Sequence, residues 1–260
     1  MLRSRQYDGR IWNYRVGRRK HPRRACTVRR MPPLRRHPPG LILIPAAHLS
    51  RYTRFHKSLA AVDRPAGTEV RFVEGFSTVE NLNWGLRKGY PEWVWLLGDD
   101  HEFRPDALTL LLDNDVDVVA PLVTMKAWPF TLLAWKEKQT PLLPTEIPQD
   151  RMIEVWACGS AGMLVRSQVL DALGDPWFMN GSGERSDEDI VFCLRAREAG
   201  FQIHVDPRVP LGHIGTFTAW PRPIDGDWEV HLDLRGGKVV VEAPRPHIMR
   251  RHRPEVSSPP

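Results

Sequence analysis

The feature that most constrains this chain is a series of short apolar segments that alternate with segments of helical periodicity, starting at residue 41. Continuously apolar segments of this length are typical of strands that are buried on both faces. The predicted strands are 41–45, 69–74, 93–97 and 116–119, and the predicted helices are 78–88 and 105–112. This order predicts an α/β fold with a mostly parallel sheet flanked by helices.

The two predicted helices have apolar residues at helical spacing, and Pro105 suits the first position of the second one. Residues 121–148 contain several prolines in no regular pattern and predict a loop or lid over a site. The remaining predictions are strands at 163–166 and 202–205, helices at 167–173 and 188–199, and a turn around Asp206-Pro207. Finally, 228–234 and 238–242, joined around Gly236-Gly237, predict a β-hairpin.

The charge of the chain is concentrated at its N-terminus. Residues 1–40 contain 13 Arg and Lys against the single acid Asp8, whereas the other 220 residues have a net charge of −6. We therefore predict a basic, disordered arm over 1–40, which could neutralise the phosphates of nucleic acid or an anionic membrane surface. A solvated extension without a partner is the alternative. Residues 244–260 are predicted to form a flexible tail.

Several classes of protein are disfavoured by the sequence. No apolar run approaches the roughly 20 residues that cross a bilayer, and the N-terminus has no apolar signal segment. The three cysteines, Cys26, Cys158 and Cys193, are widely spaced, odd in number and form no CxxC pair. These observations predict a cytoplasmic protein without a membrane span, in which Cys158 and Cys193 are small buried residues.

An acidic cluster follows the predicted strand 93–97. Gly98 is followed by Asp99, Asp100 and His101, and ligands of open α/β sheets bind at the carboxyl ends of the strands. Adjacent carboxylates repel each other, and a divalent cation relieves that repulsion. A polar loop with an acid near a helix N-terminus is the alternative interpretation.

Three further segments contain residues that could take part in chemistry. Glu188 and Asp189 begin a predicted helix. There they either stabilise the helix through its dipole or provide a general base. His213, between Gly212 and Ile214, is a candidate metal ligand or an ordinary loop histidine. The small residues 159–162 either bring the backbone close to a ligand or mark a bulge.

Taken in order, these segments resemble a GT-A glycosyltransferase, and most closely the small family-2-like enzymes of bacteria and their phages. The resemblance rests on the strand 41–45, Asn81, the segment 95–100, the segment 159–166, the run Glu188 to Cys193, the segment 199–206 and His213. It covers residues 41–216, which are followed by a hairpin extension at 217–243. It implies a Rossmann-like GT-A sheet that binds a nucleotide-sugar, together with Mn²⁺ or Mg²⁺ at an acidic DxD-type motif.

The resemblance also implies roles for individual residues. Asp99 and Asp100 match the acidic motif, but Gly98 stands where many relatives have its first Asp. The sequence Asp99-Asp100-His101 can also be aligned as a D-x-H variant, so either Asp100 or the pair Asp99 and His101 would contact the metal.

Further matches extend to other parts of the chain. His213 matches a downstream metal-binding histidine, and Glu188-Asp189 matches the acidic pair that contains the base of inverting members. Asn81 and Asp99, with Gly159 and Gly162, are carried over as residues that bind the nucleotide-sugar or line the sugar region.

The sequence thus predicts a metal-dependent glycosyltransferase that moves a sugar from a nucleotide-sugar to an acceptor hydroxyl, with inversion. One alternative is a sugar nucleotidyltransferase on the same sheet, although Pro45-Ala46-Ala47-His48 replaces the Gly-rich basic loop that such an enzyme needs after its first strand. The other alternative is a non-catalytic protein that binds nucleic acid through the arm 1–40.

Overall fold

The computed structural model describes residues 37–46, 52–126, 130–137, 140–181, 187–215, 218–224, 227–234 and 237–241. Nearly all of the predicted arm 1–40, the tail 244–260 and Cys26 lie outside these residues. All described residues belong to one compact unit, which spans 35–260. None of the helices among them has the length and apolarity needed to span a bilayer.

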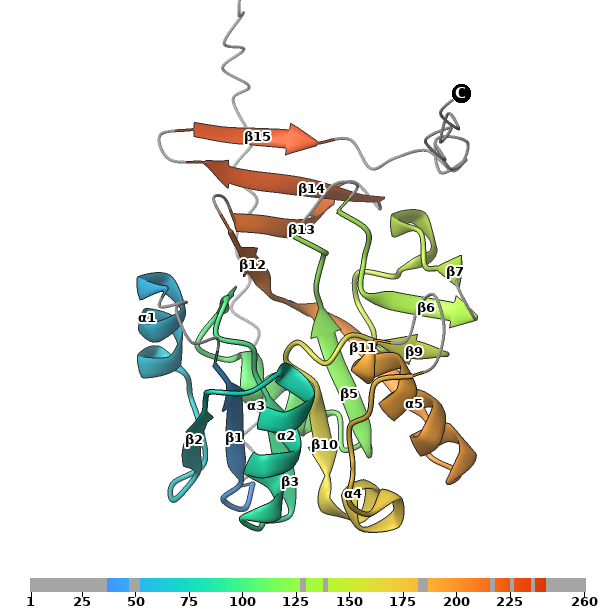
Figure 1. Cartoon of the computed structure of the whole chain (residues 1–260). Helices are drawn as coiled ribbons and strands as arrows, with labels where there is room; N and C mark the ends of the chain where they lie inside the picture. The colour runs from blue at the N-terminus through green and yellow to red at the C-terminus, as the bar shows by residue number, and fades with distance from the viewer. Residues whose placement is uncertain are drawn as a thin grey trace, which may run out of the picture. The chain divides into compact units, whose positions relative to one another are not determined.

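The centre of the fold is a seven-stranded sheet with the order β2-β1-β3-β10-β5-β11-β8 (Figure 1). Its strands are β1 (Leu41–Pro45), β2 (Glu69–Val73), β3 (Trp93–Leu96), β5 (Val118–Leu122), β8 (Ile153–Val155), β10 (Leu164–Arg166) and β11 (Ile203–Pro210). Strands β10 and β8 run opposite to the others. The predicted α/β class with a mostly parallel sheet is confirmed.

Helices cover both faces of this sheet, which explains why its strands are continuously apolar. In β1, Leu41 and Leu43 pack on one face while Ile42 and Ile44 pack on the other, and all four are fully buried. The first face is covered by α2 (Thr78–Arg87), α4 (Ser167–Leu173) and α5 (Glu188–Glu198). The second face is covered by α1 (Thr53–Ala61) and α3 (Ala107–Asp113).

A second sheet, entirely antiparallel, has the order β15-β14-β13-β12-β4. Its strands are β4 (His101–Glu102), β12 (Gly212–Ile214), β13 (Thr218–Ile224), β14 (Asp227–Leu234) and β15 (Gly237–Val241). The predicted hairpin is confirmed as β14 and β15. Figure 1 shows β12 between the main sheet and β13, so the hairpin continues a sheet that starts at the carboxyl end of β3.

Four predictions about local structure are corrected. The described residues of 121–148 contain regular structure: β6 (Ala134–Glu137) and β7 (Thr140–Pro141) form a small sheet with β9 (Ala157–Cys158), and the 3₁₀ turn η1 (Pro144–Glu146) follows β7. The irregular prolines concealed this pairing, which depends on β9, a distant partner.

The other three corrections concern element ends. Helix α3 begins at Ala107, so Pro105 precedes it. Asp206 and Pro207 continue β11 instead of forming a turn, because a bulge accommodates them and Arg208 pairs with the buried Asp206 carboxylate at 2.7 Å. His213, for which an ordinary loop histidine was one of the two interpretations, is in strand β12.

The segment that follows α4 is fastened to α2 by one buried side chain. Asn83 donates from Nδ2 to the carbonyl oxygen of Phe178 at 2.8 Å and accepts from the Phe178 amide at 3.0 Å. This pair holds the Phe178 ring, which is fully buried, stacked on Phe192 at 4.7 Å. Two main-chain groups inside the core thus depend on one amide.

We expect Asn83→Ala to lower the free energy of unfolding by about 2–4 kcal/mol, because both main-chain groups of Phe178 lose their partner in a buried place. Urea denaturation followed by circular dichroism measures the change. Arg87→Ala is the control, since Arg87 contacts Asp175 of the same segment in an exposed ion pair and its loss should change stability much less. Equal effects of the two substitutions would contradict this account.

Candidate metal centre and active site

Strand pairing brings two histidines from distant parts of the chain together. His101 begins β4 and His213 is the middle residue of β12, and the two residues are direct cross-strand partners. Their rings lie 4.5 Å apart between centroids. A main-chain hydrogen bond from the Ile214 amide to the Asp100 carbonyl, 2.7 Å long, adds to the pairing. Residues 101 and 213, which the sequence prediction grouped, are therefore neighbours.

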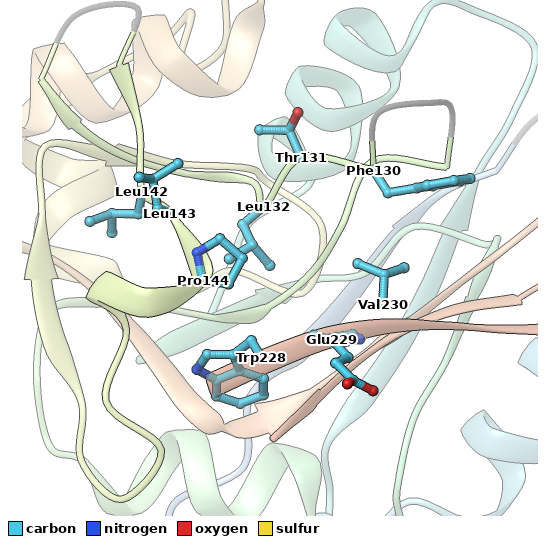
Figure 2. Close-up of a pocket in the computed structure, with 10 residues that line it drawn as sticks. Phe130, Thr131, Leu132, Leu142, Leu143, Pro144, Trp228, Glu229 and Val230 are labelled. Carbon is cyan, nitrogen blue, oxygen red and sulfur yellow. The ribbon is translucent and has the colours of Figure 1, made fainter. Parts of the chain in front are cut away.

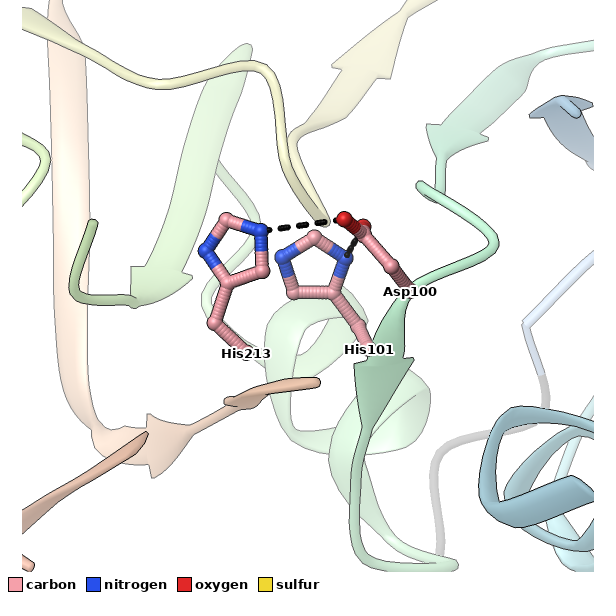
Figure 3. A group of neighbouring side chains, drawn as sticks. All are labelled: Asp100, His101 and His213. Atoms are coloured by element: carbon pink, nitrogen blue, oxygen red, sulfur yellow. Dashed lines mark hydrogen bonds and ion pairs between the residues drawn. The ribbon is translucent and has the colours of Figure 1, made fainter. Parts of the chain in front are cut away.

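Asp100 links the two rings (Figure 3). Its Oδ1 is 3.0 Å from Nδ1 of His101, and its Oδ2 is 3.2 Å from Nε2 of His213. One ligand atom from each of the three residues lies within 4.8 Å of the others, a spacing that could hold a metal ion. Asp99 is not part of this group of three.

The His213 ring is oriented by a main-chain carbonyl. Its Nδ1 lies 2.9 Å from the carbonyl oxygen of Thr124, which can only accept, so Nδ1 carries the hydrogen. The lone pair of the neutral ring is then on Nε2, which faces a carboxylate oxygen of Asp100. The two atoms are 3.2 Å apart, so a cation bound between them would be shared by the ring and the carboxylate. Metal-ligating histidines typically have such a carbonyl behind them.

The His101 ring has a nitrogen that lacks a partner. The residue is 2% exposed, and its Nδ1 is near Asp100 and the carbonyl oxygen of Gly98. Among the described residues, no hydrogen-bond partner reaches its buried Nε2. A buried ring nitrogen without a partner is costly, and a ligand at this site would satisfy it. The residues present therefore fit a divalent cation.

The charge at this centre is held on Asp100. Burial alone would raise the pKa of its carboxyl group, but hydrogen bonds with His101 and His213 hold that pKa far below its usual range. Lys126 Nζ lies 2.7 Å from Asp100 Oδ2. Burial acts to lower the pKa of Lys126, but the hydrogen bond to Asp100, together with the charges of Asp100, Tyr52 and Asp99, raises that pKa on balance. The Asp100 carboxylate therefore stays ionised, as a metal ligand must be.

Asp189 is in the first turn of α5, and the pKa of its carboxyl group is shifted in the direction opposite to that of Asp100. Burial, together with the charges of Glu188 and Asp187, raises its pKa to about 7, against the opposing effect of the amides of Ile190 and Ser160. Its Oδ1 accepts from the Ile190 amide at 2.7 Å. A carboxyl group with a pKa near 7 can both take up and release a proton at neutral pH.

The loop 159–162 connects Asp189 with the end of β3. The Ser160 amide contacts the Asp189 carboxyl group. Two residues later, the Gly162 amide donates to the Leu96 carbonyl at 2.8 Å, and Trp95 Nε1 donates to the Gly162 carbonyl at 2.7 Å. Leu96 is the last residue of β3 and Asp100 follows it closely, so Asp189 and Asp100 lie at the same edge of the sheet.

Packing alone accounts for Gly162, and it leaves little room for a side chain at Gly159. Gly162 has φ +79°, and a Cβ there would lie 2.6 Å from the Pro121 ring and 2.8 Å from Leu211. At Gly159 a Cβ would lie 3.0 Å from the side chain of Leu133. That these two glycines also line the sugar-binding region stays a prediction.

Asn81 is an inward-facing residue of α2, 2% exposed, whose Nδ2 donates to the Phe76 carbonyl at 3.2 Å. No described residue forms a hydrogen bond with its buried Oδ1.

Glu188 is half-buried at the start of α5, and the N-cap residue of that helix, Asp187, forms no side-chain capping bond. Cys158 and Cys193 are free and fully buried, as predicted.

Two residues of the centre were missed by sequence reasoning. Thr124 orients His213 through its main-chain carbonyl oxygen, and every residue type has such a group, so the sequence gives no signal for it. Lys126 follows β5, and a basic residue shortly after a strand that borders the site was the available signal. Both come from the segment after β5, for which the sequence predicted only a loop or lid.

No protein-family model and no curated protein matches the chain. Among solved structures, the chain is similar to A197 from STIV, with a TM-score of 0.52 and 13% identity over 68% of this chain and 88% of that one. It is also similar to GalNAc-T7 with UDP, GalNAc and Mn²⁺ (TM-score 0.49, 13% identity, 67% of this chain and 44% of that one). A third is S. aureus TarS in complex with UDP-GlcNAc (TM-score 0.44, 16%, 65% and 56%). The chain therefore spans less than half of the GalNAc-T7 chain.

At these identities the similarity concerns the fold. The predicted α/β fold class, a mostly parallel sheet flanked by helices, is confirmed by the sheet order and by the similarity to A197.

The raised pKa of Asp189 makes stability depend on pH. Between about pH 4 and pH 7 the folded protein keeps a proton that the unfolded chain has released, so this group's contribution to stability falls as pH rises through that range. We expect Asp189→Asn to match the wild type at pH 4 and to exceed it by up to about 4 kcal/mol at pH 8. Thermal melts across this range measure the difference, and a pH-independent difference would contradict it.

Proposed function

We propose that this protein is a metal-dependent glycosyltransferase that moves a sugar from a nucleotide-sugar to an acceptor hydroxyl with inversion. The observation that carries the proposal is the joining of Asp100, His101 and His213 at the carboxyl end of β3, the place where α/β sheets bind ligands. The order of the sequence motifs, which resembles GT-A glycosyltransferases, supports it independently.

Asp100, His101 and His213 would hold the cation, and Asp99 is proposed to contact the cation or the nucleotide beside them. A bound Mn²⁺ or Mg²⁺ supplies a Lewis acid that stabilises the negative charge on the departing nucleoside diphosphate. Two imidazoles with one carboxylate suit Mn²⁺ better than Mg²⁺, which prefers oxygen ligands. Asn81, whose Oδ1 has no hydrogen-bond partner among the described residues, and the segment Gly159 to Gly162 are proposed to contact the nucleotide-sugar.

Asp189 is proposed as the general base. Its carboxylate takes the proton from the acceptor hydroxyl while the acceptor oxygen bonds to the anomeric carbon. The bond from that carbon to the diphosphate oxygen breaks, and its electron pair leaves with the diphosphate. Glu188 is the second candidate for the base. We favour Asp189 because its pKa near 7 leaves a large fraction in the basic form at neutral pH.

The metal centre is tested by thermal shift with UDP and Mn²⁺ on the full chain. We expect Mn²⁺ to increase the stabilisation by UDP, because a ligand that binds only the folded state raises its melting temperature. His213→Ala and Asp100→Asn should each weaken Mn²⁺ binding at least about tenfold. His56→Ala, which removes an exposed histidine of α1, is the matched control. Unchanged Mn²⁺ binding in both site variants would refute the centre.

The base is tested by the pH dependence of kcat/KM with whichever donor shows turnover in a nucleotide-sugar screen. We expect the rate to rise with pH through about 7, and Asp189→Asn to lower it about 10²–10⁴-fold. Glu188→Gln should retain turnover and move the rise to lower pH, because it removes a charge that raises the Asp189 pKa. If Glu188→Gln abolishes turnover and Asp189→Asn does not, Glu188 is the base.

A further inference from the structure

An apolar pocket lies between the segment 130–144 and strands β13 and β14 (Figure 2). Its walls include Phe130, Leu132, Leu143, Trp228 and Val230, and it has a volume of about 30 Å³. By that measure a single water needs about 10–15 Å³, so the pocket admits the edge of one ring but not a whole sugar.

The pocket offers few polar partners to a ligand. The indole Nε1 of Trp228 already donates to the Ile147 carbonyl at 2.9 Å. Glu229 borders the pocket, but its carboxylate is 3.1 Å from His231 Nε2, and Figure 2 shows it pointing away from Leu132 and Phe130. A sugar hydroxyl placed here would lose its water partners without replacement. The rings of Phe130 and Trp228 favour an aromatic group instead.

Cross-strand pairing connects the strands that form one wall of this pocket with the strands of the metal centre. His101 pairs with His213, His213 with Ala219, and Ala219 with Leu232 across four strands of the second sheet. Direct partners in antiparallel strands project from the same face. Ala219 packs against two lining residues, Phe130 and Val230. The two histidines and the wall of the pocket are thus on one face.

A second connection runs through the segment after β5. Thr124, whose carbonyl orients His213, forms a β-bridge with Leu132, which lines the pocket. Two separate main-chain connections therefore link the wall of the pocket to His213 of the proposed metal centre.

We propose that this pocket receives the edge of an aromatic ring of the acceptor, so that the substrate is a hydroxyl compound with an aryl group beside the attacking oxygen. The proposal rests on the proposed glycosyltransferase activity for the role of this ligand as acceptor. The binding of an aryl group to the pocket can be measured without donor or turnover.

The probe is 4-fluorophenyl β-D-glucopyranoside, followed by ¹⁹F NMR on the full chain, with methyl β-D-glucopyranoside as the competitor. We expect the fluorophenyl compound to bind and the methyl compound not to displace it. Leu143→Trp, which fills the pocket from a half-buried position, should weaken binding at least about tenfold, and Leu143→Asp should do so by adding a charge. Leu173→Trp, at a half-buried leucine of α4, is the matched control.

Mn²⁺ then reports the distance between the two sites. When bound at Asp100, His101 and His213, this paramagnetic ion should broaden the ¹⁹F signal of the pocket-bound probe. Asp100→Asn should remove the broadening and keep the binding. Binding that survives both Leu143 variants, or broadening that is absent while Mn²⁺ is bound, would overturn the inference. A failure of Mn²⁺ to bind, measured separately by electron paramagnetic resonance, would refute the metal centre and leave the aryl site to be judged by the Leu143 variants.

Discussion

The antiparallel pairing of β4 with β12 is the interaction on which the site depends. It joins the chain that leaves β3 to the chain that leaves β11, and it places His101 opposite His213. Asp100 then contacts both rings, and the Thr124 carbonyl fixes the orientation of one of them. The pairing is main-chain bonding, so it positions the side chains without requiring them to attract each other.

The same pairing extends outward into the C-terminal sheet. Through Ala219 and Leu232 it continues to the strands that form one wall of the apolar pocket. The main sheet determines the other side of the site, where the loop 159–162 bonds to β3 at one end and contacts Asp189 at the other. Two carboxyl groups at one sheet edge thus acquire opposite properties. Asp100 is held ionised by histidines, whereas burial and Glu188 keep Asp189 partly protonated.

Sequence reasoning succeeded where local pattern and burial coincide. The apolar run at 41–45 became β1, because both faces of a central strand are covered by helices. It did less well where partners are distant. Residues 121–148 have no regular period, yet Ala134 and Trp135 pair with Cys158 and Ala157 in the small sheet. Strand β10 is as apolar as β3 and β5, which lie on either side of it. Nothing in its local sequence shows that it runs antiparallel to them.

The sequence by itself determined the α/β class, the hairpin and the candidate residues Asp100, His101 and His213, because each is expressed in periodicity or in residue type within a short window. The tertiary structure decided which of these residues meet. It brought His213 to Asp100 across 113 positions of sequence. It oriented the His213 ring through the main-chain carbonyl of Thr124, which residue type does not reveal. It also grouped Asp100 with the two histidines and left Asp99 outside the group. The physical reason is that a ligand set is defined by distances and lone-pair directions, which depend on strand register and not on spacing along the chain.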